Sequence, residues 1–352
     1  MNSMKKYLAI LLAAIMVCSC GGNGTSKKGG LIKPGSTGTP YEVLVVTNPE
    51  NWQNGSLDAL VEVLENDVPG LPQSEKAFRV SRVETGNFGR SLKYCRNIIE
   101  LKLDRTFTAP KFKFSRDVYS QPQMIMTVQA PDAASIVSYL EENGGTIVDF
   151  FTRAEMNREI ALLKEKHSLF IQEKVQNLFD CDAWVPQELG KTKTGKDFFW
   201  ATTDRGERDM SFVVYSFPYT DVQTFTADYF FNMRDSVMKA NIPGPREGQY
   251  MQTARPYVEV TDSELRGRYA QIARGLWEMK DYDMGGPFVS VSRVDEKNQR
   301  VIVTEAFVYA PGDEKKNLMR RMEAAVYSLQ LPDEIDERNF SYGLEEVEIT
   351  PE

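Results

Sequence analysis

Three segments of this chain share one local pattern, in which a strand-like run ends in a short turn and an amphipathic helix follows. They are MIMTVQ-APD-AASIVSYL, VVYSF-PYTD-VQTFTADYF and EAFVY-APGD-EKKNLMRRM. Each turn carries a polar residue that can accept hydrogen bonds from the first helical amides, namely Asp132, Thr220 or Asp313. Thr220 and Gln223 also have the spacing of a capping box. A chain that repeats this unit has to pack helices on sheets.

The spacing of apolar residues indicates which helix faces are buried. One helix is predicted from the i, i+3, i+4, i+7 spacing of Leu57, Leu60, Val61 and Leu64. Two later stripes consist of Val222, Phe225, Tyr229, Met233 and Val237, and of Leu318, Met322, Ala325 and Leu329. Apolar and aromatic runs predict strands at 41–47, 78–83, 97–103, 123–129, 183–189, 197–203 and 210–217. We therefore expect an α+β fold of mainly antiparallel sheets with helices packed on one face, and the repeated unit suggests two related halves.

A long helix is predicted between these halves, from Arg153 to Leu178, because Thr152 and Glu155 form a capping box before an apolar stripe. The stripe includes His167, the single histidine of the chain. We interpret His167 as structural, since no nucleophile and relay carboxylate stand at a recognisable spacing from it. The two halves are placed at 41–180 and 181–352.

The first twenty residues, MNSMKKYLAILLAAIMVCSC, have the features of a bacterial lipoprotein signal. Lys5 and Lys6 precede an apolar run of about 11 residues, which is too short for a helix that crosses a ~30 Å hydrocarbon core. The small residue Ser19 directly precedes Cys20, so removal of residues 1–19 as a signal peptide would leave Cys20 as the lipidated residue, carrying palmitate-type chains. A buried N-terminal helix is the alternative.

Residues 20–40 are rich in Gly, Ser, Thr and Lys, and this composition predicts a flexible tether. No acidic residue follows Cys20 before Glu42, and an aspartate beside the lipidated cysteine is the usual signal for retention in the inner membrane. We therefore expect a lipid-anchored protein on the periplasmic side of the outer membrane, within the cell envelope.

The charge balance argues against nucleic acid as a partner. The formal net charge is −8, and it becomes −10 when residues 1–19 leave, because they contain Lys5 and Lys6 and no acidic residue. Phosphate backbones need a clustered Lys/Arg surface, which the sequence lacks. Two cysteines, Cys95 and Cys181, remain beside Cys20. In an oxidising compartment they allow one disulfide, and two separately buried thiols are the alternative.

Sequence motifs for catalysis, metals and cofactors are missing. One histidine and two remaining cysteines exclude HExxH and the four-ligand zinc sites built from these side chains. The sequence also has no CxxCH, no GxSxG and no GxGxxG after a strand. Residues 190–196, GKTKTGK, match a phosphate loop only until Asp197, and the aromatic run that follows predicts a basic hairpin instead. We assign no catalytic residue, no metal site and no cofactor.

The segment 274–288, RGLWEMKDYDMGGPF, is the strongest candidate for a binding surface. Gly285 and Gly286 allow close approach of a partner or ligand, and Arg274, Trp277 and Phe288 would supply charged and aromatic recognition groups. A tight hairpin between strands at 269–279 and 288–294 is the alternative, because turn chemistry alone explains the Gly and Pro residues.

Four motifs together carry a family resemblance: the Cys20 lipobox, YEVLVVT at 41–47, PGLPQ at 69–73 and the segment 274–288. The chain resembles an uncharacterised family of Gram-negative lipoproteins, a domain of unknown function of about this length. The resemblance implies lipoprotein identity and one contiguous unit, and it brings no activity, cofactor or catalytic residue.

We therefore expect a non-catalytic lipoprotein that is held to the membrane by the lipid on Cys20 and binds an unknown envelope protein or glycan. A carboxylate-dependent hydrolase of envelope glycans is the alternative, since two carboxylates far apart in sequence can meet in the fold.

Overall fold

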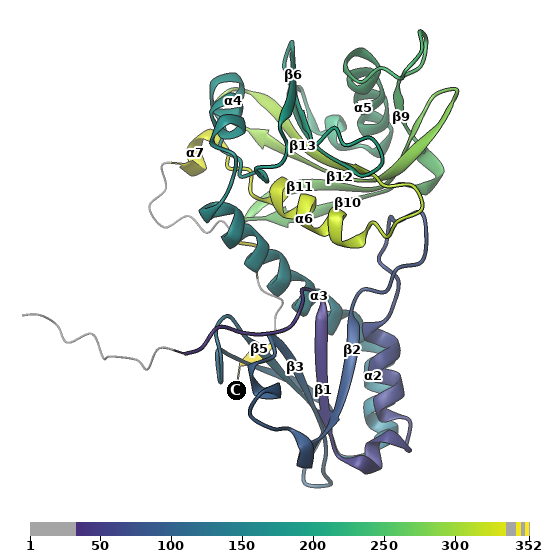
Figure 1. The fold of residues 1–352 in the computed structure, drawn as a ribbon, viewed down its shortest axis with the longest axis vertical. Helices are drawn as coiled ribbons and strands as arrows, with labels where there is room; N and C mark the ends of the chain where they lie inside the picture. Colours follow the sequence, from purple (N-terminus) through teal and green to yellow (C-terminus); the bar gives the residue numbers. More distant parts are fainter. Residues whose placement is uncertain (1–32, 336–342, 346–348, 352) are drawn as a thin grey trace, which may run out of the picture. The chain divides into compact units, whose positions relative to one another are not determined.

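The structure is a computed structural model that describes residues 33–335, 343–345 and 349–351. The predicted signal peptide at 1–19, the predicted lipidation site Cys20 and the tether up to residue 32 lie outside these described residues. From Pro34 onward the chain forms one compact unit, which Figure 1 shows as a ribbon. In the part of the chain that the structure describes, no helix combines the length and the apolar character needed to span a bilayer.

The first part of this unit is a mixed sheet with the strand order β14-β4-β5-β3-β1-β2. Strands β2, β1, β3 and β5 are parallel, β4 is antiparallel to β5, and β14 is parallel to β4. Parallel neighbours need a crossover connection, and a helix, α2, lies in the one from β1 to β2. The elements are β1 (Glu42–Thr47), η1 (Pro49–Trp52), α2 (Ser56–Leu64), β2 (Arg79–Glu84), η2 (Thr85–Asn87), η3 (Leu92–Tyr94), β3 (Asn97–Leu103), β4 (Lys111–Arg116), β5 (Met124–Ala130), α3 (Ala133–Glu165) and β14 (Thr350–Pro351).

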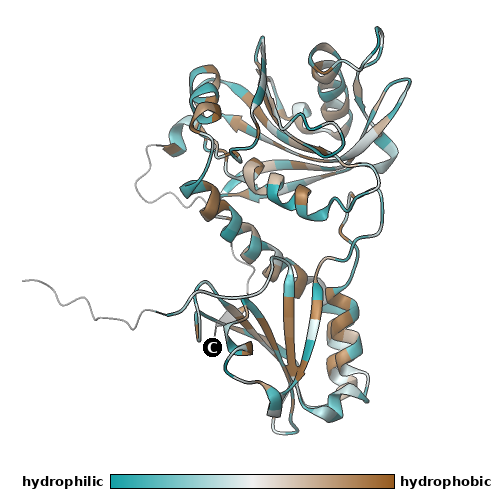
Figure 2. Ribbon diagram, viewed as in Figure 1, coloured by the Kyte–Doolittle hydropathy of each residue, from teal (hydrophilic) through white to brown (hydrophobic). Residues whose placement is uncertain are grey.

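Helices α2 and α3 pack on one face of this mixed sheet. The four predicted apolar residues of α2 are all buried, which confirms that helix and its buried face. They share a core with Val43 and Val45, because alternate side chains of a strand point to the same face. Leu44 and Val46 point to the other face, where residues of the 85–96 connection pack against them. Figure 2 shows hydrophobic residues along β1 and on α2.

Helix α3 begins earlier than predicted. Asp132 starts it, because its carboxylate accepts a hydrogen bond from the backbone nitrogen of Ser135 at 2.9 Å. This confirms Asp132 as a helix cap. Thr152 and Glu155 lie inside α3, so the predicted helix start at that capping box is wrong. The spacing of a capping box also occurs within a continuous helix, where the local sequence cannot show that a turn of helix already precedes it.

The predicted single helix 153–178 is in fact two helices. Helix α3 ends at Glu165 and α4 (Leu169–Phe179) follows it. His167 lies in the break, where its Nδ1 is 2.9 Å from the carbonyl oxygen of Leu163 and its ring contacts Trp184. The His167 ring thus connects the end of α3 to Trp184, and these contacts are those of a structural residue.

The second part of the unit is an antiparallel sheet with the order β10-β11-β12-β13-β8-β7-β6, and β9 pairs with β11. The elements are α4, β6 (Lys191–Gly195), β7 (Phe198–Thr202), β8 (Asp209–Pro218), η4 (Val222–Phe225), α5 (Ala227–Asn241), β9 (Met251–Thr253), η5 (Arg255–Tyr257), β10 (Glu259–Leu265), β11 (Arg268–Met279), β12 (Tyr282–Asp295), β13 (Arg300–Tyr309), α6 (Lys316–Tyr327) and α7 (Pro332–Ile335). Strands β6 and β7 form the basic hairpin that GKTKTGK predicts. The α+β class is confirmed.

Helices cover both faces of the antiparallel sheet, whereas the sequence predicts one covered face. Helices α4 and α6 and the last part of α3 pack on one face, and α5 packs on the other. The two parts of the fold also differ in topology, since one sheet is mixed and the other antiparallel. They are therefore not copies of one unit. Helix α4, placed in the first half by the boundary at residue 180, contributes Ile171, Val175 and Phe179 to the second core.

Two of the three predicted helix caps are wrong. Asp221, not Thr220, caps η4, and Thr226 caps α5. The buried stripe of α5 shifts with this later start, to Phe230, Arg234 and Met238, while Val222 is 73% exposed. Asp313 does not cap α6 either, because that helix begins at Lys316 with an N-cap at Lys315 whose side chain makes no capping bond.

The predicted tether is shorter than residues 20–40. Backbone hydrogen bonds join Ser36 to Gln121 and Thr37 to Tyr94, at 3.2 and 2.7 Å. Residues 34–37 thus lie against the mixed sheet, where main-chain pairing fixes them although they have few apolar side chains.

Candidate functional site

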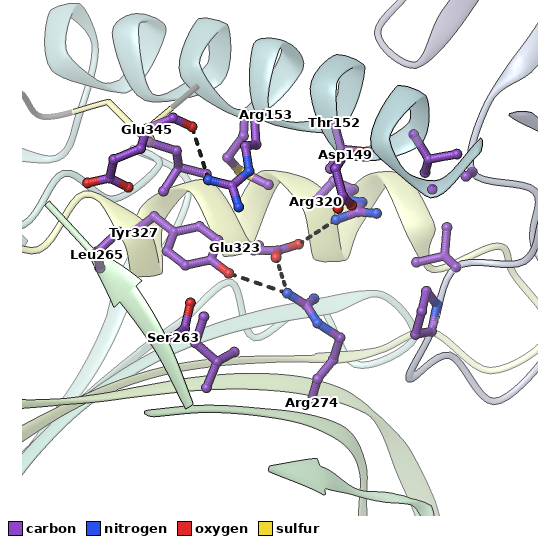
Figure 3. A pocket seen from close by; sticks show the side chains of 18 of the residues that line it. Asp149, Thr152, Arg153, Ser263, Leu265, Arg274, Arg320, Glu323, Tyr327 and Glu345 are labelled. Atoms are coloured by element: carbon purple, nitrogen blue, oxygen red, sulfur yellow. Dashed lines mark hydrogen bonds and ion pairs between the residues drawn. The ribbon is translucent and has the colours of Figure 1, made fainter. Parts of the chain in front are cut away.

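The candidate site is a cavity of about 380 Å³ within the compact unit. Its walls come from α3, α6, strands β10 and β11, the loop at 66–69 and residues 344–345. Figure 3 shows that its polar side chains point toward one another around Glu323. Its lining includes three arginines and five carboxylates: Arg153, Arg274, Arg320, Asp67, Asp149, Glu264, Glu323 and Glu345.

Glu323 is the central residue of this cavity. One of its carboxylate oxygens pairs with Nη2 of Arg274, and the other accepts a hydrogen bond from Nη1 of Arg320 at 3.1 Å. The hydroxyl of Tyr327 lies 3.4 Å from the same Arg274 nitrogen (Figure 3). The Glu323 side chain is only 3% exposed, so two guanidinium groups from different elements neutralise a buried carboxylate.

This arrangement fixes the protonation states. Burial alone would raise the pKa of Glu323, but the charges of Arg274 and Arg320 outweigh it and lower that pKa to about 2. Burial and the neighbouring Glu323 charge raise the pKa of Tyr327 to about 12. Near neutral pH the carboxylate is therefore ionised and the phenol is protonated.

The PGLPQ segment positions Arg274 from the opposite side of the cavity. Gly70 has a φ of +77°, and a Cβ atom there would lie 2.9 Å from Cγ of Arg274. Glycine is needed for both reasons, since it adopts the left-handed region without strain and leaves room for the arginine. Leu71 packs against both cores, which ties the loop to the two sheets.

The C-terminal residues 343–345 close another wall. Arg153 donates to the carbonyl oxygen of Glu345 at 3.0 Å (Figure 3), and Asn157 bonds to the backbone of Leu344 through both its amide nitrogen and its oxygen. Side chains of α3 thus hold the end of the chain against the cavity.

Two polar atoms in the lining have no hydrogen-bond partner among the described residues. They are Oγ1 of Thr152 and Nε of Arg320, and both are buried. Both atoms are shielded from solvent, so they leave the polar network of the wall incomplete without being exposed to the cavity.

The structure brings only one of the five predicted surface residues into this site. Arg274 lines the cavity, but Trp277 and Phe288 are each only 1% exposed and belong to the core on the α5 side of the sheet. Gly285 and Gly286 lie within β12, and the β11–β12 turn falls at residues 280–281. The predicted exposed surface around Trp277 is therefore wrong. The alternative, a tight hairpin between these two strands, is present, but its turn precedes the Gly-Gly-Pro sequence.

The two glycines serve packing inside the sheet. Trp277 donates a hydrogen bond from Nε1 to the carbonyl oxygen of Val308 at 3.3 Å, across Gly286. A Cβ atom on Gly286 would lie 2.0 Å from that oxygen. The sequence correctly predicts that another group lies close to these glycines. That group is the Val308 carbonyl of the same chain, not a partner or a ligand.

Of the two alternatives for the cysteines, the structure has separate thiols, because Cys95 and Cys181 are both free. They belong to different cores, Cys181 beside the antiparallel sheet and Cys95 beside the mixed one. Burial raises the pKa of Cys181 to about 12.

Sequence reasoning missed Glu323, Arg320 and Tyr327. The available signal was the charged pair Arg320 and Arg321 beside the apolar stripe of α6, with Glu323 directly after the buried Met322. Their partner Arg274 is 49 residues away from Glu323, so the site could not be read from spacing. Among the described residues, no group of three or more His, Cys, Asp and Glu is placed to hold a metal ion.

Individual known proteins carry no argument about the fold or function of this chain. No curated protein matches it. Among solved structures, the Saccharomyces cerevisiae Ran-binding protein Mog1p has a TM-score of 0.27 at 10% identity, covering 43% of this chain and 90% of Mog1p. The human StarD13 (DLC2) lipid transfer and protein localization domain has a TM-score of 0.19 at 10% identity, covering 45% of this chain and 91% of that domain. TM-scores this low support no inference about fold or function.

Two family models divide the chain between them. Residues 36–164, which form the mixed sheet and α3, match the domain of unknown function DUF8532. Residues 168–328, from the start of α4 to the end of α6, match the domain of unknown function DUF4837. Matches to two domains of unknown function thus cover most of the chain, which is consistent with an uncharacterised domain-of-unknown-function family.

Proposed function

We propose that this protein is a non-catalytic lipoprotein of the cell envelope, anchored through Cys20 on the periplasmic side of the outer membrane. In this proposal it binds a polar envelope ligand, a protein segment or a glycan, in the cavity around Arg274 and Glu323. The observation that carries the binding role is the charged lining of this cavity, in which three arginines and five carboxylates surround a space of about 380 Å³.

The protonation state of Glu323 fits a binding role better than the role of a general acid in hydrolysis. A glycan hydrolase needs a carboxylic acid whose pKa is raised, so that it can protonate the leaving group. In this cavity the buried carboxylate of Glu323 has a lowered pKa, and its two arginine partners hold it as a permanent anion. Such a group orients its neighbours and a ligand but does not exchange protons near neutral pH.

The anchor is tested with Cys20→Ala in the native host. We expect wild-type protein to remain with outer-membrane fractions after a carbonate wash and the variant to be released, because the lipid is carried on the Cys20 thiol. A variant that stays with the membrane after the wash would refute the anchor.

The binding role is tested by photo-crosslinking in intact cells. A photoreactive residue at Glu264, an exposed position that lines the cavity, should capture a discrete envelope component. The same residue at Val222, which is exposed and outside the cavity lining, is the control. Arg320→Gln, introduced into the protein with the photoreactive residue at position 264, should lower the crosslinking yield, because it removes a guanidinium group from the cavity wall.

Purified peptidoglycan fragments identify the ligand class by competition. If they compete for the crosslink, the ligand is a glycan, and if only a protein adduct persists, it is a protein segment. Equal labelling from Glu264 and Val222 would contradict a site in this cavity.

A further inference from the structure

A second cavity, of about 520 Å³, lies beside the first residues that the structure describes. It shares no lining residue with the Arg274 cavity. Three arginines line it, Arg96, Arg116 and Arg158, and Ser36 contributes to its wall. Guanidinium groups thus gather in this concave site although the chain has a formal net charge of −8.

Two of these arginines share a single buried carboxylate. Nη2 of Arg96 and Nη1 of Arg158 each lie 2.8 Å from a different oxygen of Glu155. Their side chains are 18% and 8% exposed, and that of Glu155 is 1% exposed. Two guanidinium groups therefore share one carboxylate in direct contact, while the charges of Asp117 and Glu159 also act on Arg158 and Arg96. Charge that is withdrawn from water is costly unless a counter-charge meets it directly.

The hydrogen-bonding capacity of Arg96 is also incomplete. Its Nε is buried and has no hydrogen-bond partner among the described residues. At the outer edge, Arg116 is accompanied by the carboxylates of Asp117 and Glu165. The two carboxylates outnumber the one guanidinium group at this edge. An anion would therefore be attracted only by Arg96 and Arg158 at the floor of the cavity.

The cavity also has an apolar side. Besides the amides Gln123 and Asn157, its lining includes Pro122 and Met124 next to and at the start of β5, and Ala154, Ala161 and Leu162 of α3. Leu162 is 55% exposed, so the apolar side continues to the protein surface. A site with guanidinium groups at its floor and an apolar wall fits an anion that carries a hydrocarbon part.

The chain leaves the fold at this cavity. Gln121 donates from its backbone nitrogen to the carbonyl oxygen of Pro34 at 2.9 Å, which fixes the chain directly before Ser36. Cys20 precedes Pro34 by 14 residues. Fully extended, these residues would span at most about 50 Å, and as a flexible coil they would average about 20 Å. A lipid on Cys20 would keep this cavity close to a bilayer.

We propose that this cavity binds the phosphate headgroup of a membrane phospholipid, with Arg96 and Arg158 facing the phosphate and the Leu162 side facing the acyl region. A free phosphate ion shares the charge chemistry, but it would leave the apolar wall without a partner. This site rests on the proposed function in one respect, because the lipid on Cys20 would bring the cavity to the bilayer. Binding of the protein without that lipid to vesicles tests the site independently of the anchor. Failure of the anchor and failure of this site are therefore separate results.

The test uses protein without residues 1–20, a truncation that removes no described residue, and follows its co-sedimentation with vesicles. Vesicles of phosphatidylcholine alone are compared with vesicles that also contain phosphatidylglycerol, because this acidic protein should be repelled by an anionic surface unless it has a specific site. Arg96→Gln removes one floor charge, and Arg105→Gln removes one exposed charge outside the cavity. Ala161→Phe fills the apolar side without changing any charge.

We expect binding to phosphatidylglycerol vesicles that falls at least tenfold in Arg96→Gln and in Ala161→Phe but not in Arg105→Gln, with all proteins giving the same near-UV circular dichroism. If Arg96→Gln fails to fold, the uncharged Ala161→Phe decides the question. Equal losses in Arg96→Gln and Arg105→Gln, or no binding by the wild type, would overturn the proposal. Calorimetric binding of inorganic phosphate without vesicle binding would reassign the site to a free anion and also overturn it.

Discussion

Both carboxylate oxygens of Glu75 accept hydrogen bonds from the backbone at the start of helix α6, at 2.7 Å from the nitrogen of Lys315 and 2.8 Å from that of Lys316. Glu75 precedes Lys315 by 240 residues. A residue from the DUF8532 part therefore caps the helix that carries Glu323, Arg320 and Tyr327. The carboxylate satisfies two amides that lack an intrahelical partner and meets the positive end of the helix dipole.

Replacing this cap should destabilise the protein measurably. We expect Glu75→Gln to lower the free energy of unfolding by about 1 to 2 kcal/mol, since a charged cap is replaced by a neutral amide. Urea denaturation followed by circular dichroism measures the change. Glu62→Gln, at an exposed position of α2, is the matched control and should change stability by less than about 0.5 kcal/mol. Equal effects of the two substitutions would contradict the capping role.

The ion pairs of Glu323 should make stability depend on acid pH. The folded-state pKa of about 2 lies below the unfolded value of 4.5, so the stabilisation is fully present above pH 4.5 and is lost as the pH falls toward 2. The loss should be about 3 kcal/mol. Unfolding free energies measured across this range should fall less steeply for Glu323→Gln than for the wild type. Parallel curves would show that Glu323 is not held as an anion.

A side chain at Gly286 should disrupt the sheet. We expect Gly286→Ala to cost about 3 kcal/mol or more, because its Cβ would meet the Val308 carbonyl oxygen that accepts the Trp277 hydrogen bond. Thermal unfolding and tryptophan fluorescence measure the two effects. The control is Gly190→Ala, where a Cβ has no neighbour within 4 Å. If Gly286→Ala were as stable as this control, the close packing at β12 would be refuted.

The two thiols should differ in reactivity. Cys181 is fully buried with a pKa raised to about 12, whereas Cys95 is partly exposed and burial raises its pKa less. At pH 8, in protein without residues 1–20, a thiol reagent should label Cys95 slowly and Cys181 only after unfolding. Cys95→Ser and Cys181→Ser assign each phase. Absence of any reactive thiol in unfolded, unreduced protein would instead indicate a disulfide.

Features that depend on neighbouring residues were predictable from sequence. The α2 helix, β3 at residues 97–103, the Asp132 cap and the β6–β7 hairpin all appear where local patterns place them. Local patterns did not predict the start of helix α5. Thr220 and Gln223 have the spacing of a capping box, but Asp221 and Thr226 provide the caps, since several polar residues there compete for the same helix start.

The candidate site was predictable only in part. Arg274 was identified from an unusual segment, but its role was assigned to a surface that the structure buries. Trp277 and Phe288 look like recognition residues in the sequence because aromatic side chains serve binding and packing equally well. Only the pairing of β11 with β12 shows that these rings point into the core while Arg274 reaches the cavity.

The α+β class, most strands and the buried face of α2 follow from the sequence, because hydrophobic periodicity over ten to twenty residues is a local property. The tertiary structure decided the mixed topology of the first sheet, the burial of the two glycines and the capping of α6 by Glu75. It also brought Arg274 to Glu323 and placed Arg96 and Arg158 around one carboxylate. Each of these depends on which distant segments become neighbours, and a local pattern carries no information about that choice.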